Sequence, residues 1–370
     1  MKWVNCSKRS SHVIPAALPI IGDEERAAVD RVMRSGMLAQ GPEVAAFESE
    51  FSALVNGDHC IAVNSGTSAL HMAFLAAGVE CGDEVIVPSF SFAATANSVA
   101  LTGARPVFAD IEPNYFNLDP KSVESLITPK TKAVMPVHLY GHPADLVELK
   151  SICEKHNLLL FEDAAQAVAA SLNGRPVGTW GVASSFSFYP TKNMTSGEGG
   201  MVTTNSSEVS RKVRLLRNQG MERRYENEVI GFNTRMTDIH AAIGRVQLGK
   251  LAGWTKTRQQ NAAFLSANIT GVVVPPIAPG AEHVFHQYTI RIEGLSRDEF
   301  SKQLTELGVG NGVYYPTPIH RLPSFGQSVD LPATELVAKQ CLSLPVHPSL
   351  SQQDLEKIVD AVNKTAGAGS

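Results

Sequence analysis

Apolar and polar residues follow a repeating pattern through the first half of the chain. Short apolar runs without polar alternation, each typical of a strand buried on both faces of a largely parallel sheet, alternate with helix-like segments. The apolar runs are residues 60–63, 84–90, 105–111, 132–139 and 158–163. Ligands of such an open sheet bind beyond the carboxyl ends of the strands. We therefore expect the chemistry in the loops that follow these runs.

Further helices are predicted before and after this alternation. Acidic residues at 23–25 and the glycine Gly36 indicate a helix between them, because acids favour a helix start and glycine a helix end. A second helix follows Pro42 and stops at Gly57. From Thr237 a helical pattern continues through residue 265, which is too long for one compact layer. We expect this long helix to connect two domains.

The last third of the chain predicts a smaller α+β part. One strand is expected at residues 285–292, and helices are expected at residues 296–307, 333–344 and 351–364. The fold class predicted is therefore α/β, with a large domain at residues 13–250 and a small C-terminal domain at residues 251–366.

Lys192 occupies an unusual context within SFSFYPTKNMTSGEGGMVTT, residues 185–204. The stretch indicates a strand, a turn opened by Pro190, a glycine-rich reversal and a second short strand. A lysine held at the lip of a buried sheet has its pKa lowered toward neutrality, as an amine needs before it condenses with a carbonyl. The hypothesis is a lysine that carries pyridoxal phosphate (PLP). An ordinary hairpin lysine fits the stretch equally well.

Three other features follow strands of the same sheet. NSGTSAL, residues 64–70, enters a helix whose free N–H groups could hold a phosphate, or it could be a simple Ser/Thr helix cap. Asp163 ends a buried strand and needs a partner: the protonated pyridine nitrogen of PLP would serve, and so would the start of the next helix. Phe92 could cover a planar ring, although an aromatic residue there also suits the core.

Neither the histidines nor the cysteines predict a metal site. His138 and His142 are four residues apart, but Gly141 and Pro143 make this segment a turn, so the two rings do not share a helix face. The cysteines are odd in number and widely separated, which gives no case for a disulfide framework or a zinc site. They are Cys6, Cys60, Cys81, Cys153 and Cys341.

Two groups of arginines differ in their expected roles. Arg211, Arg214 and Arg217 are three residues apart on a helix predicted for residues 207–220 and are interpreted as a solvated stripe. Arg223 and Arg224 lie in the irregular segment that follows and are better placed to meet a diphosphate.

Composition narrows the class of protein. The 370 residues are 44% hydrophobic and 18% charged, which is typical of a soluble globular protein with a substantial core. A net charge of −4, with both signs well mixed, gives no case for nucleic acid or membrane partners. No apolar run has the length of a membrane span or the pattern of a signal peptide, so a cytoplasmic location is expected.

Five motifs together resemble the DegT/DnrJ/EryC1/StrS family of PLP-dependent sugar aminotransferases, over nearly the whole chain. In order they are NSGTSAL, PSFSFAATANS, EDAAQA, SFSFYPTKNMTSGEGGMV and GFNTRMTDIHAAIGRVQL. The resemblance implies PLP-dependent transferase fold type I, like that of aspartate aminotransferase. It also implies a homodimer with two active sites shared at the subunit interface.

The resemblance implies specific roles around the cofactor. Lys192 would be the Schiff-base lysine and Asp163 the partner of the pyridine nitrogen. Gln166 would bind the ring hydroxyl, and Phe92 would stack on the ring.

Phosphate and substrate ligands are implied in the same way. The phosphate ligands would be Gly66, Thr67, Ser68 and Ser187, with Asn233 reaching across from the other subunit. The substrate-binding residues would be Tyr189, Arg223, Arg224 and His320.

The reaction implied is transfer of an amino group from an amino acid, expected to be glutamate, to a nucleotide-linked 4-keto-6-deoxyhexose, as in perosamine-synthase-like members. Dehydratase-like members replace the lysine with histidine, whereas this chain keeps Lys192. Two alternatives are an aminotransferase of the same family acting on a cyclitol or an aminobenzoate precursor ketone, and a non-enzymatic regulatory protein on this fold. The intact Lys192 and Asp163 argue against the regulator.

Overall fold

The computed structural model describes residues 13–367. At its centre is a seven-stranded sheet in the order β1-β9-β8-β5-β4-β2-β3. Neighbouring strands are parallel except around β9, which runs antiparallel to both β1 and β8. The largely parallel sheet predicted from the apolar runs is therefore confirmed. Its strands are β1 (His59–Val63), β2 (Glu84–Pro88), β3 (Arg105–Ala109), β4 (Thr131–Val134), β5 (Leu159–Asp163), β8 (Ala183–Ser187) and β9 (Gly200–Thr204).

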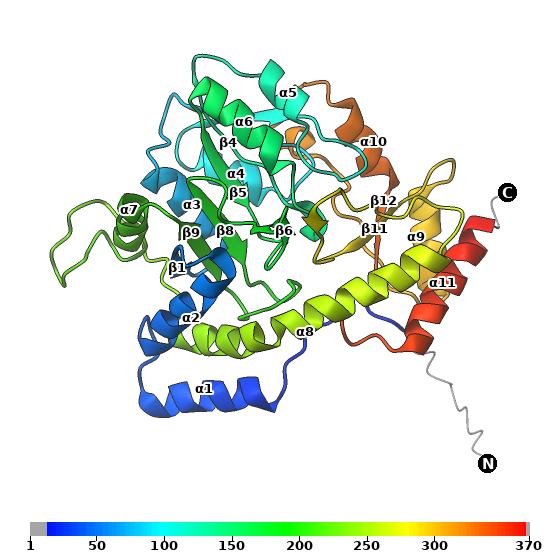
Figure 1. Ribbon diagram of the computed structural model, residues 1–370, viewed down its shortest axis with the longest axis horizontal. Helices are drawn as coiled ribbons and strands as arrows, with labels where there is room; N and C mark the ends of the chain where they lie inside the picture. Colours follow the sequence, from blue (N-terminus) through cyan, green and yellow to red (C-terminus); the bar gives the residue numbers. More distant parts are fainter. Residues whose placement is uncertain (1–12, 368–370) are drawn as a thin grey trace, which may run out of the picture.

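Helices cover both faces of this sheet (Figure 1). Alternate residues of β1 show why: Ile61 and Val63 pack in one apolar cluster, and Cys60 and Ala62 pack in another on the opposite face. The first face is covered by α3 (Gly66–Ala76), α4 (Ala94–Ala100) and α7 (Ser207–Arg217). The second face is covered by α2 (Pro42–Ser52), α5 (Pro120–Ser125) and α6 (Leu146–His156).

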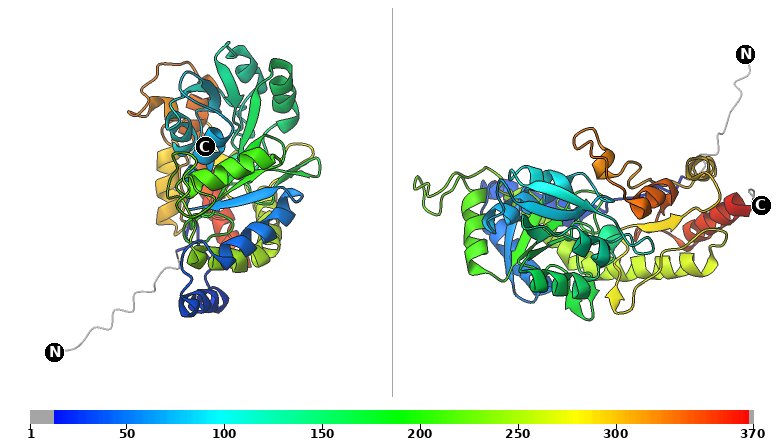
Figure 2. Two further views of the ribbon diagram at one scale, coloured as in Figure 1. Left: turned by 90° about the vertical axis from the view of Figure 1, so that its left-hand side faces the viewer. Right: turned by 90° about the horizontal axis from the view of Figure 1, so that it is seen from above.

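The long helix α8 (Asp238–Asn268) contributes to two cores. Ala241 and Leu251 pack with the face of the large sheet that α2 covers, while Ala262 and Leu265 pack in a separate cluster toward the C-terminus. Figures 1 and 2 show this helix running from beneath the sheet to the C-terminal elements. The domain boundaries at residues 250 and 251 stay a prediction.

The C-terminal core differs from expectation at one element. A helix was expected over residues 333–344, but α10 (Pro332–Gln340) ends at Gln340 and the next residues form the strand β12 (Cys341–Leu344). Its four residues are all buried and pair antiparallel with β11 (Tyr288–Arg291), which would otherwise lack a partner in this two-stranded sheet. A short apolar run fits either element by pattern alone, and here strand pairing decides. The helices α9 (Arg297–Glu306) and α11 (Gln352–Gly367) complete this core.

Smaller elements surround these two cores. The helix α1 (Asp23–Ser35) packs on α8 and ends, as predicted, at Gly36, whose φ of 71° favours glycine. The remaining elements are the three-stranded sheet of β6 (Ser171–Leu172), β7 (Arg175–Pro176) and β10 (Ala281–Glu282), and the 3-10 turns η1 (Ala53–Val55), η2 (Leu139–Gly141) and η3 (Ile319–Arg321). Of the helices within residues 13–367, none combines the length and apolar character needed to cross a membrane.

The arginines on α7 do not form one solvated stripe, because the interpretation was wrong for Arg217. This side chain is only 4% exposed, and its Nη1 lies 2.5 Å from Oε1 of Glu48. Arg214, 40% exposed, contacts the other oxygen of the same carboxylate at 2.9 Å. Glu48 lies on the neighbouring α2, so local sequence could not reveal this partner. Arg211 is at the surface, as expected, and bridges Glu222 and Glu228.

The free thiols agree with the expected absence of a disulfide framework as far as the structure reaches. Cys60, Cys81, Cys153 and Cys341 are unpaired. Cys6 lies outside the described residues.

Candidate active site

A pocket of about 550 Å³ opens beyond the carboxyl ends of the central strands. The loops after β1, β2, β5 and β8 all reach it, as the topology of an open parallel sheet predicts. Of the residues singled out from sequence, those that line it are Gly66, Thr67, Phe92, Asp163, Gln166, Ser187, Tyr189 and Lys192.

Lys192 lies in the turn between β8 and β9, and the protein holds that turn from several sides. The N–H of Lys192 donates to the carbonyl of Tyr189 at 2.9 Å, and the hydroxyl of Thr195 donates to the carbonyl of Phe188 at 2.9 Å. Asn193 is buried and donates from Nδ2 to the carbonyl of Val284 at 2.9 Å. The turn is therefore fixed to the rest of the fold, with the lysine side chain directed at the pocket.

The electrostatic setting of Lys192 makes its amine unusually easy to deprotonate. Burial lowers the pKa of Lys192 to about 8, although the nearby negative charge of Asp163 opposes that shift. Among the described residues no hydrogen bond engages Nζ. An amine that is partly neutral near physiological pH and has no internal partner can act as a nucleophile or as a proton carrier.

Asp163, the last residue of β5, is 4% exposed. Oδ2 accepts a hydrogen bond from Thr95 Oγ1 at 3.0 Å, and Oδ1 accepts one from the N–H of Ala165 at 3.1 Å. Burial raises the pKa of Asp163, opposed by these two hydrogen bonds and by the charge of Lys192. No arginine or lysine forms an ion pair with it in the described part of the chain. The carboxylate therefore has acceptor capacity left on its pocket side.

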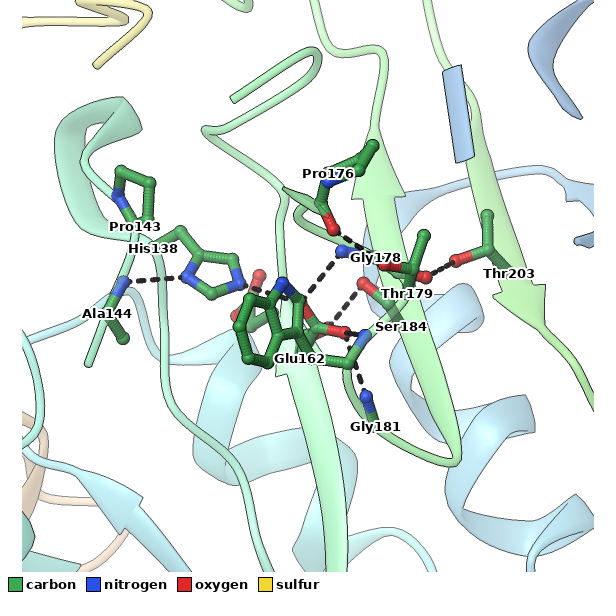
Figure 3. A network of polar contacts seen from close by, with 12 residues as sticks. His138, Pro143, Ala144, Glu162, Pro176, Gly178, Thr179, Gly181, Ser184 and Thr203 are labelled. Atoms are coloured by element: carbon green, nitrogen blue, oxygen red, sulfur yellow. Dashed lines mark hydrogen bonds and ion pairs between the residues drawn. The ribbon is translucent and has the colours of Figure 1, made fainter. Parts of the chain in front are cut away.

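Glu162, one residue earlier, faces the opposite side of the sheet and is fully engaged (Figure 3). Oε1 accepts from the N–H groups of Trp180 and Gly181 at 2.7 and 3.1 Å, and Oε2 accepts from the N–H of Gly178 at 2.7 Å. His138 Nε2 lies 3.2 Å from Oε2. Glu162 thus anchors the loop after β7. Each of its oxygens has two hydrogen-bond partners, which leaves no acceptor position for a ligand.

The two histidines that are four apart in sequence serve separate contacts. His138 accepts the N–H of Ala144 at Nδ1, so its hydrogen is on Nε2 and is donated to Glu162. His142 accepts the N–H of Ala278 at Nε2, and its other ring nitrogen contacts the carbonyl of Pro143. The nitrogens of each ring are thus engaged by neighbouring protein groups, and the two rings share none of these partners.

The start of α3 combines both predicted interpretations. Ser65 is the helix cap, because its Oγ accepts the N–H of Ser68 at 3.1 Å and also contacts the Ser68 hydroxyl at 3.0 Å. Ser68 is thereby used inside the cap and does not line the pocket. Gly66 and Thr67 do line it, and within residues 13–367 their N–H groups meet no acceptor. Close packing makes Gly66 necessary, since a Cβ there would lie 2.8 Å from Cβ of Ser187.

Gln166 and the aromatic residues form the opposite wall. Gln166 Oε1 accepts the N–H of Tyr140 at 2.7 Å, and Nε2 donates to the hydroxyl of Tyr315 at 3.3 Å. Phe92 is 58% exposed, and its ring centroid lies 5.9 Å from that of Tyr315. Both rings line the pocket, and Tyr315 also packs against an apolar cluster. Tyr189 is half exposed at the same pocket.

The chemical groups around this pocket match the groups that PLP needs. Unpartnered N–H groups at a helix start suit the phosphate, a buried carboxylate with spare acceptor capacity suits the pyridine nitrogen, and an amine of lowered pKa suits the aldehyde. All three lie around one pocket.

Besides Ser68, four of the predicted residues lie outside this pocket. Asn233 is exposed and forms a bridge with Asn218, and Arg223 and Arg224 lie on the exposed excursion after α7, at the far edge of the molecule in Figure 1. His320 is buried, with Nδ1 at 2.6 Å from Ser89 Oγ and Nε2 at 3.1 Å from Glu335. A single chain therefore does not bring these side chains to Lys192.

Several pocket residues were missed by sequence reasoning. The wall farthest from α3 comes from Arg258 on α8 and from residues around β11 and β12, including His286, Ser343 and His347. Arg258 lies inside a predicted helix, and no local signal distinguishes it from a surface arginine. Tyr315 belongs to the proline-rich stretch that also contains His320, and it was not singled out from sequence although it lines the pocket.

The chain is similar to known proteins in both sequence and structure. The model of the DegT/DnrJ/EryC1/StrS aminotransferase family matches residues 19–363. The chain is 43% identical over 344 residues to a pleiotropic regulatory protein of Geobacillus stearothermophilus, covering 90% of this chain and 92% of the relative. It is 40% identical over 363 residues to the GDP-perosamine synthase of Caulobacter vibrioides, covering 95% and 98%. The crystal structure of DesV from S. venezuelae is similar with a TM-score of 0.90 and 41% identity, covering 93% of this chain and 94% of that one.

Proposed function

Because the chain belongs to the DegT/DnrJ/EryC1/StrS aminotransferase family, we propose that it transfers the amino group of glutamate to C4 of a nucleotide-linked 4-keto-6-deoxyhexose, in the cytoplasm. The protein is a PLP-dependent sugar aminotransferase of fold type I. The amino donor, the keto sugar and the carbon aminated belong to the proposal.

The observation that carries the proposal is the meeting of Lys192 and Asp163 at one pocket. When bound, PLP supplies an electron sink that stabilises negative charge at the carbon losing its proton. The carboxylate of Asp163 would hold the pyridine nitrogen protonated, and Gly66 and Thr67 would hold the phosphate through their N–H groups. The amine of Lys192, with its lowered pKa, would accept the proton at the donor's α-carbon and return it.

Gln166, Phe92 and Tyr189 would position the reacting groups. Gln166 is held by Tyr140 and Tyr315 and can present its amide only along one wall. Phe92 would cover one face of the cofactor ring, and Tyr189 would contact the sugar. Ser187 would complete the phosphate site beside Gly66.

A second copy of the chain would complete the site. The excursion after α7 displays apolar side chains that no core of its own chain covers, including Ile230, which is 93% exposed. We propose a homodimer in which this segment packs on the partner, bringing Asn233 to the partner's phosphate site and Arg223 and Arg224 to the diphosphate of its substrate. His320 would act on the substrate side only if the bound sugar reaches past Tyr315, because its ring is enclosed in the free chain.

Mixing inactive subunits tests the shared site. Lys192→Ala and Asn233→Ala chains, each inactive alone, should regain activity when mixed, since mixed dimers contain one site with both residues intact. If subunit exchange is demonstrated and no activity returns, Asn233 does not act across the interface.

The substrate is tested with a panel of nucleotide-linked keto sugars and glutamate, with the carbon aminated identified in the product. The proposal predicts that a 4-keto-6-deoxyhexose is the best substrate. Turnover of a ketone without a nucleotide at equal efficiency would favour the cyclitol or aminobenzoate alternative. The name of the pleiotropic regulatory protein among the relatives favours the regulatory alternative. That alternative predicts a purified protein that takes up no PLP.

A further inference from the structure

Arg258 is a buried cation on the pocket wall that meets no carboxylate within residues 13–367. It projects from α8, is 6% exposed and lines the same pocket as Lys192. Nη1 donates to the carbonyls of Phe285 and His286 at 3.1 and 3.5 Å, whereas Nε is buried without an acceptor among the described residues. The guanidinium therefore donates only to neutral carbonyls through Nη1, and its Nε–H group has no acceptor within the described part of the chain.

Arg217 is the other arginine that is almost fully buried in the described part of the chain, and Glu48 neutralises it. Arg297, whose side chain is 9% exposed, meets Asp298. Burial lowers the pKa of Arg258 to about 10, with no acidic residue opposing the shift. Since an unpaired buried charge is costly, a cation kept in this state at a pocket indicates an anion that arrives from outside.

The groups around Arg258 do not supply that anion. His286 also lines the pocket, and its pKa is lowered well below the usual value by burial and by the charges of Lys192 and Arg258. His347 contacts the carbonyl of Pro15 through Nε2, and burial lowers its pKa as well. Both rings are therefore neutral near pH 7. The acidic residues that line the pocket are Asp163 and Glu198, and neither pairs with Arg258.

We propose that Arg258 binds a carboxylate of the amino-acid donor. This inference rests on the proposed function, because it assigns the donor subsite of that same pocket. A guanidinium presents parallel N–H groups that match the two oxygens of a planar carboxylate. One such fork suffices for a carboxylate, while the diphosphate of a nucleotide sugar carries its charge over more oxygens and meets the exposed arginines 223 and 224 in the proposed dimer.

The pocket geometry gives the donor a direction. Lys192 and Arg258 both line the pocket, and the charge of each lowers the pKa of His286, so both cations lie near that one histidine. An amino acid whose carboxylate pairs with Arg258 would extend its amino group toward Lys192. The keto acid left after transfer has the same carboxylate and would leave from the same subsite.

Binding of glutarate, a dicarboxylate that cannot react, tests this assignment by calorimetry on the cofactor-loaded protein. Arg258→Gln should weaken glutarate binding and raise the KM for glutamate by about 10- to 100-fold, the range expected for losing a charge-assisted hydrogen bond. Binding of a nucleoside diphosphate should change by less than about twofold. Arg258→Lys, which keeps the charge and loses the fork, should fall between wild type and Arg258→Gln, and it serves as the test if the glutamine variant does not fold.

Alanine as donor separates the two carboxylates of glutamate. If Arg258→Gln raises the KM for alanine as much as that for glutamate, the α-carboxylate is bound. If only glutamate is affected, the side-chain carboxylate is bound. Either result supports the proposal.

Arg297→Gln is the matched control. Arg297 is also buried and also donates from Nη1 to two backbone carbonyls, of Ala338 and Cys341, but Asp298 neutralises it and it does not line the pocket. This change should lower thermal stability without changing glutarate binding. The proposal is overturned if Arg258→Gln keeps glutarate affinity within about twofold, or if it loses nucleoside diphosphate binding instead. With the KM for each donor taken from the half-reaction that converts PLP to its amino form, none of these measurements involves a keto sugar, so they stand apart from failure of the proposed sugar substrate.

Discussion

Two adjacent residues of β5 place their carboxylates in opposite environments. Glu162 faces away from the pocket and accepts three backbone N–H groups and a histidine (Figure 3). Asp163 faces the pocket and accepts only two hydrogen bonds. Both side chains are almost fully buried, so burial alone does not distinguish them. The two carboxylates differ in whether protein groups fill all of their acceptor positions.

The buried arginines repeat this contrast. Arg217, away from the pocket, shares Glu48 with Arg214, while Arg258, at the pocket, meets no acid among the described residues. Nε of each arginine is buried without an acceptor, so the contrast lies in the charge partner and not in the count of hydrogen bonds. A buried charge without a partner is costly, and the pocket is where a ligand could supply the missing charge.

Replacing Asp163 tests the pocket side of the comparison and should give the largest effect. Without the carboxylate the cofactor's nitrogen is no longer held protonated, so Asp163→Ala should slow conversion of PLP to its amino form by glutamate about a thousandfold, or roughly 4 kcal/mol of barrier. Single-turnover absorbance measures this step directly. The variant should still bind PLP. A rate within about threefold of wild type would mean that Asp163 is only a helix cap.

Glu162→Ala tests the opposite side and should affect folding rather than chemistry. It leaves three backbone N–H groups and His138 without their acceptor, which should lower the free energy of unfolding by about 3–5 kcal/mol. Denaturant unfolding of the cofactor-free protein measures the loss. Asp163→Ala is the control, because removing an incompletely paired buried carboxylate should not destabilise the cofactor-free fold. Equal destabilisation by both changes would remove the distinction drawn between the two residues.

The pH dependence of PLP uptake tests the state of Lys192. Its pKa is lowered to about 8 from the ordinary value of 10.5 by burial, so the amine is the neutral nucleophile above that pH. Uptake by cofactor-free protein should rise about tenfold per pH unit below pH 8 and level off above it. Between about pH 8 and 10.5 the unfolded chain binds more protons at this lysine than the folded chain, so folding stability from this group rises with pH there. A rate that keeps rising to pH 10 would show an ordinary, solvated lysine.

The surface arginines give the smallest expected change. Arg223 and Arg224 are exposed, and Arg224 stacks over Tyr225 with 4.9 Å from its guanidinium carbon to the ring centroid. Replacing both with alanine should raise the KM for the nucleotide sugar several-fold, about 1 kcal/mol, and the loss should shrink as salt rises because screening already weakens exposed charges. The glutamate half-reaction should be unchanged. Equal loss in both half-reactions would indicate damage to the cofactor site.

Sequence predicted best where one residue's neighbours along the chain define its role. The apolar runs, the strand ends and the Lys192 turn are local patterns, and they located the sheet and the loops after β1, β2, β5 and β8 that line the pocket. The sheet order, with β9 antiparallel between β1 and β8, follows from pairing between distant segments and was not predicted.

The failures share one cause. Arg217 was interpreted as solvated because Glu48 is far away in sequence, and Cys341–Leu344 was interpreted as helix because its partner strand β11 is equally remote. Arg258 was missed because the absence of a partner is visible only in three dimensions.

Chemical trapping at Lys192 tests the central claim most directly. Borohydride reduction of the PLP-loaded protein, followed by proteolysis and mass spectrometry, should find the cofactor attached to the peptide that contains Lys192, and the Lys192→Ala variant should take up no covalent label and complete no transamination cycles. A label on a different lysine, or sustained turnover by Lys192→Ala, would contradict the account.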